Sequence, residues 1–255
     1  MSEREYATFS KLYMILVVAI TITYIGCIIF GEEIFVRVAL ILSTLVFLVS
    51  AFFPYRYFSE RGLRELERVY FNLIIAIISL LASEFTYFLT YVHPQLHFFI
   101  LTLVAIFYAF FYLFFAFCVA SFINFWVISP EKGAIISKVY LASFTLLISF
   151  LMLNTYLYIA GGKLAFKEPI VYALASSLDA FFIPLLVYTF HIFRKSIFER
   201  SWTLVLAGIT MEFLGNFGRN LAIIYSPSIP VVRLFEILCI GGYLIAGYGF
   251  VKQIF

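Results

Sequence analysis

Apolar stretches of about 20 residues recur along the chain and alternate with short segments rich in charged residues, Pro or Gly. A helix of about that length crosses the hydrocarbon core of a bilayer. The pattern predicts about eight transmembrane helices, at residues 12–30, 34–53, 69–91, 98–128, 139–160, 170–193, 202–225 and 231–250. We therefore expect an all-α, polytopic membrane helix bundle that forms a single integral membrane domain over residues 1–255.

Proline positions agree with these boundaries, because proline interrupts a helix unless it lies in the first turn. One proline, Pro184, falls inside a predicted span and should kink it. The other six lie at or beyond predicted span ends: Pro54, Pro94, Pro130, Pro169, Pro227 and Pro230.

The two halves of the chain, residues 1–130 and 131–255, share a weak internal similarity. Glu84 in SLLASEFTYFLT and Asn216 in TMEFLGNFGRNL are separated by about half the chain. Each follows a charged segment and precedes an aromatic tract. An even number of spans in each half predicts two parallel four-helix repeats that face the same way.

Composition supports a membrane protein, since 64% of the residues are hydrophobic and 12% are charged, against about 45–50% and about 25% in soluble domains. Most Lys and Arg residues fall in segments on one side of the predicted spans, whereas Arg37, Lys163 and Lys167 are assigned to the other side. The positive-inside rule then predicts a multi-pass protein of the cell membrane with both termini in the cytoplasm. No basic block suits nucleic acid. The cysteines lie within apolar spans, and we expect no cofactor and no metal site.

The predicted span at residues 202–225 is apolar but carries Glu212, Asn216, Arg219 and Asn220. Their spacing places them on one helical face. Gly208 and Gly215 lie on or beside that stripe, where another helix could approach closely. Ionisable groups at membrane depth are costly and point to a functional site.

Further polar residues fall in the outer halves of other predicted spans, so the sequence predicts a polar cleft open to the outside. Its candidate ligand-binding residues are Glu84, Asp179, Glu212, Asn216, Arg219, Asn220, Arg233 and Glu236. At about 1.5 Å per residue, Asp179 and Glu212 lie near the membrane midplane. Four carboxyl groups face two guanidinium groups in this set. We therefore expect either a bound cation or a proton on at least one of Asp179 and Glu212.

The second half resembles the multi-spanning, eight-helix N-terminal sensor regions of prokaryotic membrane signalling proteins. The matching segments are SSLDAFFIPLLVY, FRKSIFERSW, GITMEFLGNFGRN and RLFEILCIGGYLIAGYGF. Such regions often carry an Asp at the position of Asn216. The resemblance implies a sensor of a ligand or of the membrane state. We expect no output domain within residues 1–255, so a signal would leave through helix movement or a cytoplasmic or membrane signalling partner.

These observations favour a non-enzymatic receptor or sensor-like module that contacts membrane lipid and binds a small polar or cationic ligand. A secondary transporter coupled to protons or cations is the first alternative, with the same acids as a relay. An intramembrane lipid hydrolase of the lysoplasmalogenase type is the second, with Asp179 and Glu212 as acid and base. The polar residues could instead close on one another in ion pairs that only hold helices together.

Overall fold

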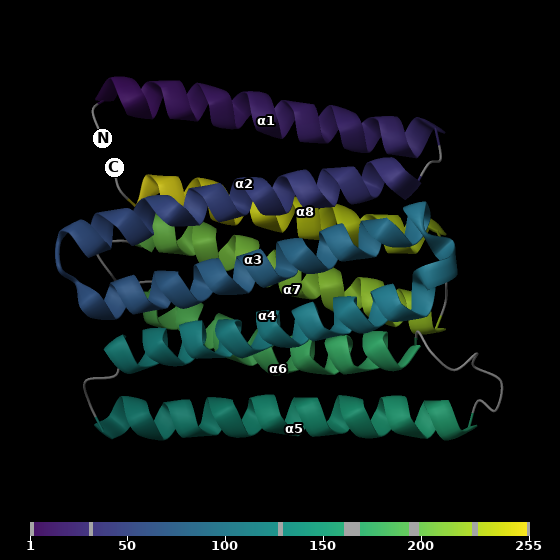
Figure 1. Ribbon diagram of the computed structural model, residues 1–255. Coiled ribbons are helices and arrows are strands. Elements are labelled where there is room, and N and C mark those ends of the chain that lie inside the picture. Colours follow the sequence, from purple (N-terminus) through teal and green to yellow (C-terminus); the bar gives the residue numbers. More distant parts are fainter. Residues whose placement is uncertain are drawn as a thin grey trace.

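The computed structural model describes residues 3–30, 33–126, 130–160, 169–193, 199–225 and 229–253. This part of the chain forms eight α-helices and a one-turn 3-10 helix, η1, at Pro94–Leu96, and it contains no strand (Figure 1). The helices are α1 (Glu3–Phe30), α2 (Glu33–Glu60), α3 (Arg64–Val92), α4 (His97–Trp126), α5 (Pro130–Ala160), α6 (Pro169–Phe193), α7 (Glu199–Tyr225) and α8 (Ile229–Lys252). Each predicted apolar segment thus corresponds to a helix.

Six of the described helices are long and apolar enough to cross a membrane: α2, α3, α4, α5, α6 and α8. This indicates a multi-pass helical membrane protein. α7 has 27 residues, about 40 Å of helix, but its polar residues reduce its hydropathy. The described apolar part of α1 is the shorter segment Tyr13–Gly26.

The helix that contains Pro54 corrects one sequence-based boundary. Pro54 was expected at a span end, but α2 continues through it to Glu60. The chain then reverses over Arg61 and Gly62, where Gly62 has φ +68°. That conformation is accessible to glycine at little cost. The turn between α2 and α3 therefore occurs about two helical turns after the proline rather than at it.

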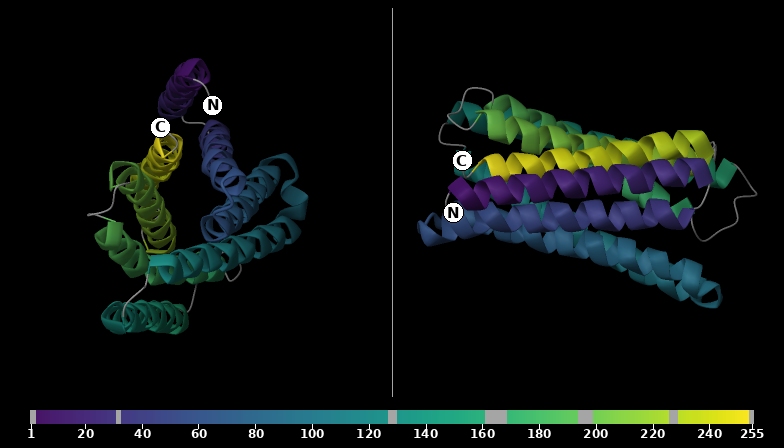
Figure 2. Two further views of the ribbon diagram at one scale, coloured as in Figure 1. Left: turned by 90° about the vertical axis from the view of Figure 1, so that its left-hand side faces the viewer. Right: turned by 90° about the horizontal axis from the view of Figure 1, so that it is seen from above.

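Six helices form a ring in which neighbours pack in the order α2, α3, α4, α6, α7 and α8, with α8 returning to α2. The other two lie outside the ring, α1 against α2 and α5 against α6 (Figure 2). α1 begins and α8 ends at the same end of the bundle (Figure 1). We call this the termini end and the opposite end the far end.

Aromatic side chains fill the ring from its middle to the termini end. Near the middle, Phe115 contacts Phe182 and Phe213, with ring centroids 5.1 and 4.9 Å apart. Toward the termini end, Phe47 stacks on Phe250 at 5.5 Å. Burial of large rings contributes strongly to packing, so this half of the ring is an apolar core, and the buried polar groups concentrate toward the far end.

Candidate functional site

The four polar residues of α7 share one face of the helix, as their spacing predicted, and this face is buried inside the ring. Glu212, Asn216, Arg219 and Asn220 are each no more than 5% exposed. Glu212 lies at the centre of α7, and Arg219 lies six residues before its far end, or about 9 Å. The stripe therefore runs from the middle of the bundle toward the far end.

A partly open cavity of about 40 Å³ lies beside the far end of this stripe, and we call it the far-half cavity. A buried water needs about 10–15 Å³ measured in the same way, so the cavity has room for about three water molecules. Its polar side is formed by Arg37, Ser83, Glu84, Arg219 and Asn220. Its remaining wall is formed by Tyr87, Leu101, Val104, Tyr108, Tyr172, Ala175 and Ile223.

Two buried charged groups in this wall have unsatisfied atoms. Arg219 donates from Nη2 to the Tyr108 hydroxyl at 3.3 Å, but its Nε and Nη1 have no hydrogen-bond partner in the described part of the chain. Glu84 accepts from Tyr108 on Oε1 at 3.1 Å, whereas its Oε2 has no such partner among the same residues. Buried polar groups are usually satisfied, so these atoms mark a place where a ligand or water can bind.

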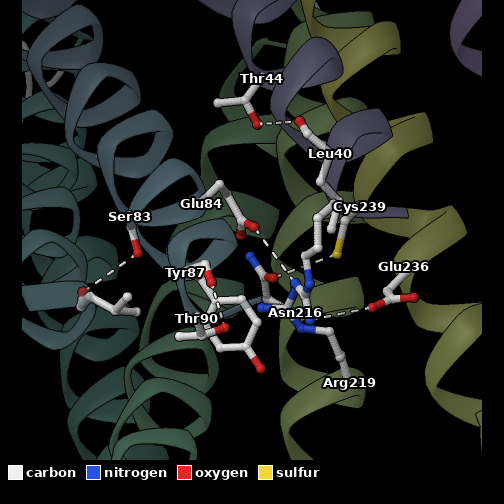
Figure 3. Close-up of polar contacts among 12 residues, drawn as sticks. Leu40, Thr44, Ser83, Glu84, Tyr87, Thr90, Asn216, Arg219, Glu236 and Cys239 are labelled. Atoms are coloured by element: carbon white, nitrogen blue, oxygen red, sulfur yellow. Dashed lines mark hydrogen bonds and ion pairs between the residues drawn. The ribbon is translucent and has the colours of Figure 1, made fainter. Parts of the chain in front are cut away.

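Arg37, which the sequence placed on the side of the membrane opposite most Lys and Arg residues and not among the candidate ligand-binding residues, belongs to this site. It lies in α2 with its side chain 13% exposed, 3.7 Å from Glu84 and 3.9 Å from Glu236 (Nη to Oε). Glu236 also pairs with Arg233 at 2.9 Å, as their i, i+3 spacing predicted. Figure 3 shows Glu84, Asn216, Arg219 and Glu236 reaching toward one another from α3, α7 and α8. Arg37 therefore adds a third guanidinium group to the two counted from the sequence.

Asp179 lies deeper and has its own partners. It is fully buried, accepts from the Tyr112 hydroxyl at 2.7 Å and accepts from the Asn220 amide at 3.4 Å. The Ala175 carbonyl oxygen lies 3.2 Å from the same hydroxyl and shares its single proton with Asp179. Both carboxyl oxygens of Asp179 thus face neutral donors, and no ion pair to it is found in the described segments.

Glu212 forms a separate group at the middle of α7. Its Oε1 accepts from Asn216 and from the Tyr243 hydroxyl at 3.2 Å. The Cys239 thiol lies 3.5 Å from Asn216 Oδ1. Glu212 borders a smaller space of about 10 Å³ that is otherwise lined by apolar residues, Gly and Tyr243. The pairing of Glu212 with Arg219 or Arg233 that a closed network would require is not seen among the described residues.

The eight candidate residues thus lie in one column but in three groups with different partners. Glu84, Arg219, Arg233 and Glu236 are connected through Arg37 and Tyr108, Asp179 joins Asn220, and Glu212 joins Asn216. Sequence reasoning missed the tyrosines that join or complete these groups: Tyr108, Tyr112 and Tyr243. The i, i+4 spacing of Tyr108 and Tyr112 was a usable signal, but 33 Phe and 18 Tyr in the chain hid it.

No group of three or more His, Cys, Asp or Glu suited to a metal ion occurs among the described residues. No protein-family model, curated protein or solved structure matched the chain.

Proposed function

We propose that this chain is an integral membrane receptor or sensor-like module that binds a small polar ligand in the far-half cavity. The observation that carries the proposal is that two residues lining this cavity, Arg219 (5% exposed) and Glu84 (4% exposed), each have buried side-chain atoms without a hydrogen-bond partner among the described residues. An unsatisfied buried charged group costs more than about 1–3 kcal/mol. A ligand that satisfied both groups would recover that cost, and its binding would stabilise the protein.

Binding without passage fits the described interior better than transport does. A relay needs ionisable or polar groups along the whole path. The column ends near Glu212, and the cavity of about 40 Å³ toward the termini end is lined by apolar and aromatic residues with Cys118 and Thr189 but no charged side chain. Transport would therefore require a path through the aromatic core toward the termini end, and this path would form only by a large rearrangement of that core.

The lipid hydrolase alternative requires two carboxyl groups that converge on one cavity. Asp179 bonds to Tyr112 and Asn220, whereas Glu212 bonds to Asn216 and Tyr243. Neither residue lines the far-half cavity. These separate environments favour binding over acid–base catalysis.

We further propose that all eight helices span the membrane and that the two halves are parallel repeats. The packing partners of α1–α4 recur in α5–α8: α1 on α2 matches α5 on α6, and α2 on α3 matches α6 on α7. Likewise α3 on α4 matches α7 on α8, and α2 on α8 matches α6 on α4. An experimental structure in which the halves do not superpose by rotation about the bundle axis would contradict the duplication.

The orientation proposal places the termini end in the cytoplasm. The last two turns of α2 and the turn that leads into α3, at that end of the bundle, are rich in Arg. The end of α2 also carries an exposed ion pair, Arg56 Nε to Glu60 at 2.7 Å. Lys and Arg concentrate on the cytoplasmic side of membrane proteins. A ligand would then enter from outside, and a signal would leave through helix movement toward a partner at the termini end. The orientation can be tested by fusing to either terminus a reporter that is active only in the periplasmic or extracellular space. Activity of that reporter would contradict this orientation.

The test is a melting experiment on purified protein in lipid nanodiscs, with small polar anions, cations and neutral molecules. A ligand at about 100 times its Kd adds about 2.7 kcal/mol of stability, which should raise the Tm by several degrees. We expect at least one class of molecule to raise the Tm of the wild type. Arg219→Gln should abolish this rise, and the exposed control Arg56→Gln should retain it.

If no molecule shifts the wild type, and Arg219→Gln only lowers its Tm, the polar column is a structural network and the proposal fails.

A further inference from the structure

Two residues that line the far-half cavity carry unsatisfied hydrogen-bonding atoms, which are donors on one residue and an acceptor on the other. Arg219 offers two unpartnered donors, Nε and Nη1, and Glu84 offers one unpartnered acceptor, Oε2. Both side chains are more than nine-tenths buried. Arg37 Nη1 is 3.7 Å from Glu84 Oε2, too far for a hydrogen bond. A ligand that satisfies this wall must therefore present acceptors toward Arg219 and a donor toward Glu84.

The charge of the wall limits the ligand further. Arg37 and Arg219 line the cavity with one carboxylate, Glu84. Glu236, the second acid near Arg37, already holds Arg233 at 2.9 Å. Two guanidinium groups against one carboxylate favour a group with negative charge, and a guanidinium binds a carboxylate especially well because its planar donors match the two oxygens.

Size and surface complete the description. The cavity has room for about three waters, so its occupant has few heavy atoms. Leu101, Val104 and Ile223 contribute apolar side chains to the wall. One or two carbon atoms of the ligand would lie against these side chains.

We infer that the far-half cavity binds a small carboxylate that carries a hydroxyl or amino group on the adjacent carbon. The carboxylate accepts from Arg219, and the hydroxyl or amino group donates to Glu84 Oε2. This inference rests on the proposed binding function and names the class of ligand for the same cavity. It replaces a cationic ligand with an acid.

The test uses five two-carbon probes that differ in one group each: glycolate, glycine, acetate, ethanolamine and ethylene glycol. Affinity is measured by calorimetry on the full chain in nanodiscs at constant ionic strength. We expect glycolate or glycine to bind about tenfold or more tightly than acetate, since acetate leaves Glu84 Oε2 unpaired. We expect weaker binding still of ethanolamine and ethylene glycol, which lack the carboxylate.

Two variants assign the contacts. Arg219→Lys keeps the charge but loses the planar donors. It should weaken the binding of glycolate, glycine and acetate by about tenfold or more. Glu84→Gln should reduce the preference for glycolate over acetate toward unity, because an amide accepts less strongly than a carboxylate. Arg56→Gln, at the exposed termini end, should bind like the wild type.

Equal binding of acetate and glycolate to the wild type would overturn the role of Glu84 in selecting the ligand. If ethanolamine or ethylene glycol binds and the three carboxylate probes do not, the inference is overturned but the proposed binding function stands. If none of the five probes binds, the inference fails, and the proposed function is then decided by the wider panel of the melting experiment.

Discussion

At the scale of single residues, Arg37 is the residue that joins the buried carboxylates in the far half of the bundle. This guanidinium lies within 4 Å of two carboxylates from different helices, Glu84 and Glu236, and stacks over the Tyr87 ring at 4.4 Å. Glu236 has a second partner in Arg233. Glu84 has no other ion pair in the described part of the chain, so it depends most on Arg37.

Arg37→Gln should therefore destabilise the protein by about 3–5 kcal/mol, because it leaves a buried carboxylate without its cation. Glu84→Gln in the same chain should recover part of that loss, since the neutral pair carries no unpaired charge. A double-mutant cycle measured by denaturant or thermal melting reports the coupling. If the losses of stability from Arg37→Gln and Glu84→Gln simply add in the double variant, the contact between these residues does not contribute to stability. The exposed pair gives the control: Arg56→Gln should cost less than about 1 kcal/mol.

Tyr112 provides a second test at this scale. Its hydroxyl contacts Asp179 Oδ1 and the Ala175 carbonyl inside the ring. Tyr112→Phe removes the donor and leaves Asp179 with one bond from Asn220, and we expect a loss of about 1–3 kcal/mol. The matched control is Tyr156→Phe on α5, where Tyr156 is 67% exposed and the change should be nearly neutral. Equal melting of both variants would show that the Tyr112 hydroxyl contributes nothing.

At the scale of helices, α7 and α8 pack closely because glycines remove side chains from their interface. A Cβ placed on Gly208 would lie against backbone atoms of Ala246 and Gly242, and one on Gly242 would lie 2.5 Å from the Gly208 carbonyl oxygen. Close approach of backbones through small residues is a common way to join membrane helices. It brings Glu236 on α8 into the same region as Arg219 on α7.

Gly208→Ala should therefore separate α7 from α8 and destabilise the protein, by about 1–3 kcal/mol for an overpacked contact. Gly26→Ala on α1 is the control, because a Cβ there meets nothing within 4 Å, and alanine is the better helix former. We expect melting to show a clear loss for Gly208→Ala and no loss for Gly26→Ala. The opposite ranking would mean that the α7–α8 interface tolerates a wider spacing.

At the scale of the whole molecule, the bundle has a polar far half and an aromatic termini half. A cysteine introduced at Ala175 would line the far-half cavity, whereas one at Leu206 would line the apolar space near the termini end. We expect a charged, water-soluble thiosulfonate to label the Ala175→Cys variant more than the wild type, in which only the native cysteines can react. The Leu206→Cys variant should be labelled no more than the wild type. Labelling of Leu206→Cys at a comparable rate would indicate a continuous aqueous path and would favour the transporter alternative.

The sequence by itself determined the helices and the inward face of α7. Long apolar runs permit helix and little else in a bilayer, since every backbone group must bond within its own segment. The spacing of Glu212, Asn216, Arg219 and Asn220 on one helix predicted a shared face, and all four are buried. The close pair Arg233 and Glu236 was predictable in the same way, because both residues lie on one helix.

The tertiary structure decided which helices bring their polar residues together. From the sequence, Arg37 was counted only among the few basic residues on the outer side of the membrane, whereas its two carboxylate partners lie on α3 and α8. The roles of Tyr108 and Tyr112 depend on contacts between helices far apart in the chain. Periodicity describes which face of a helix is polar, but the partner of that face depends on the order of helices around the ring, and no local pattern encodes that order.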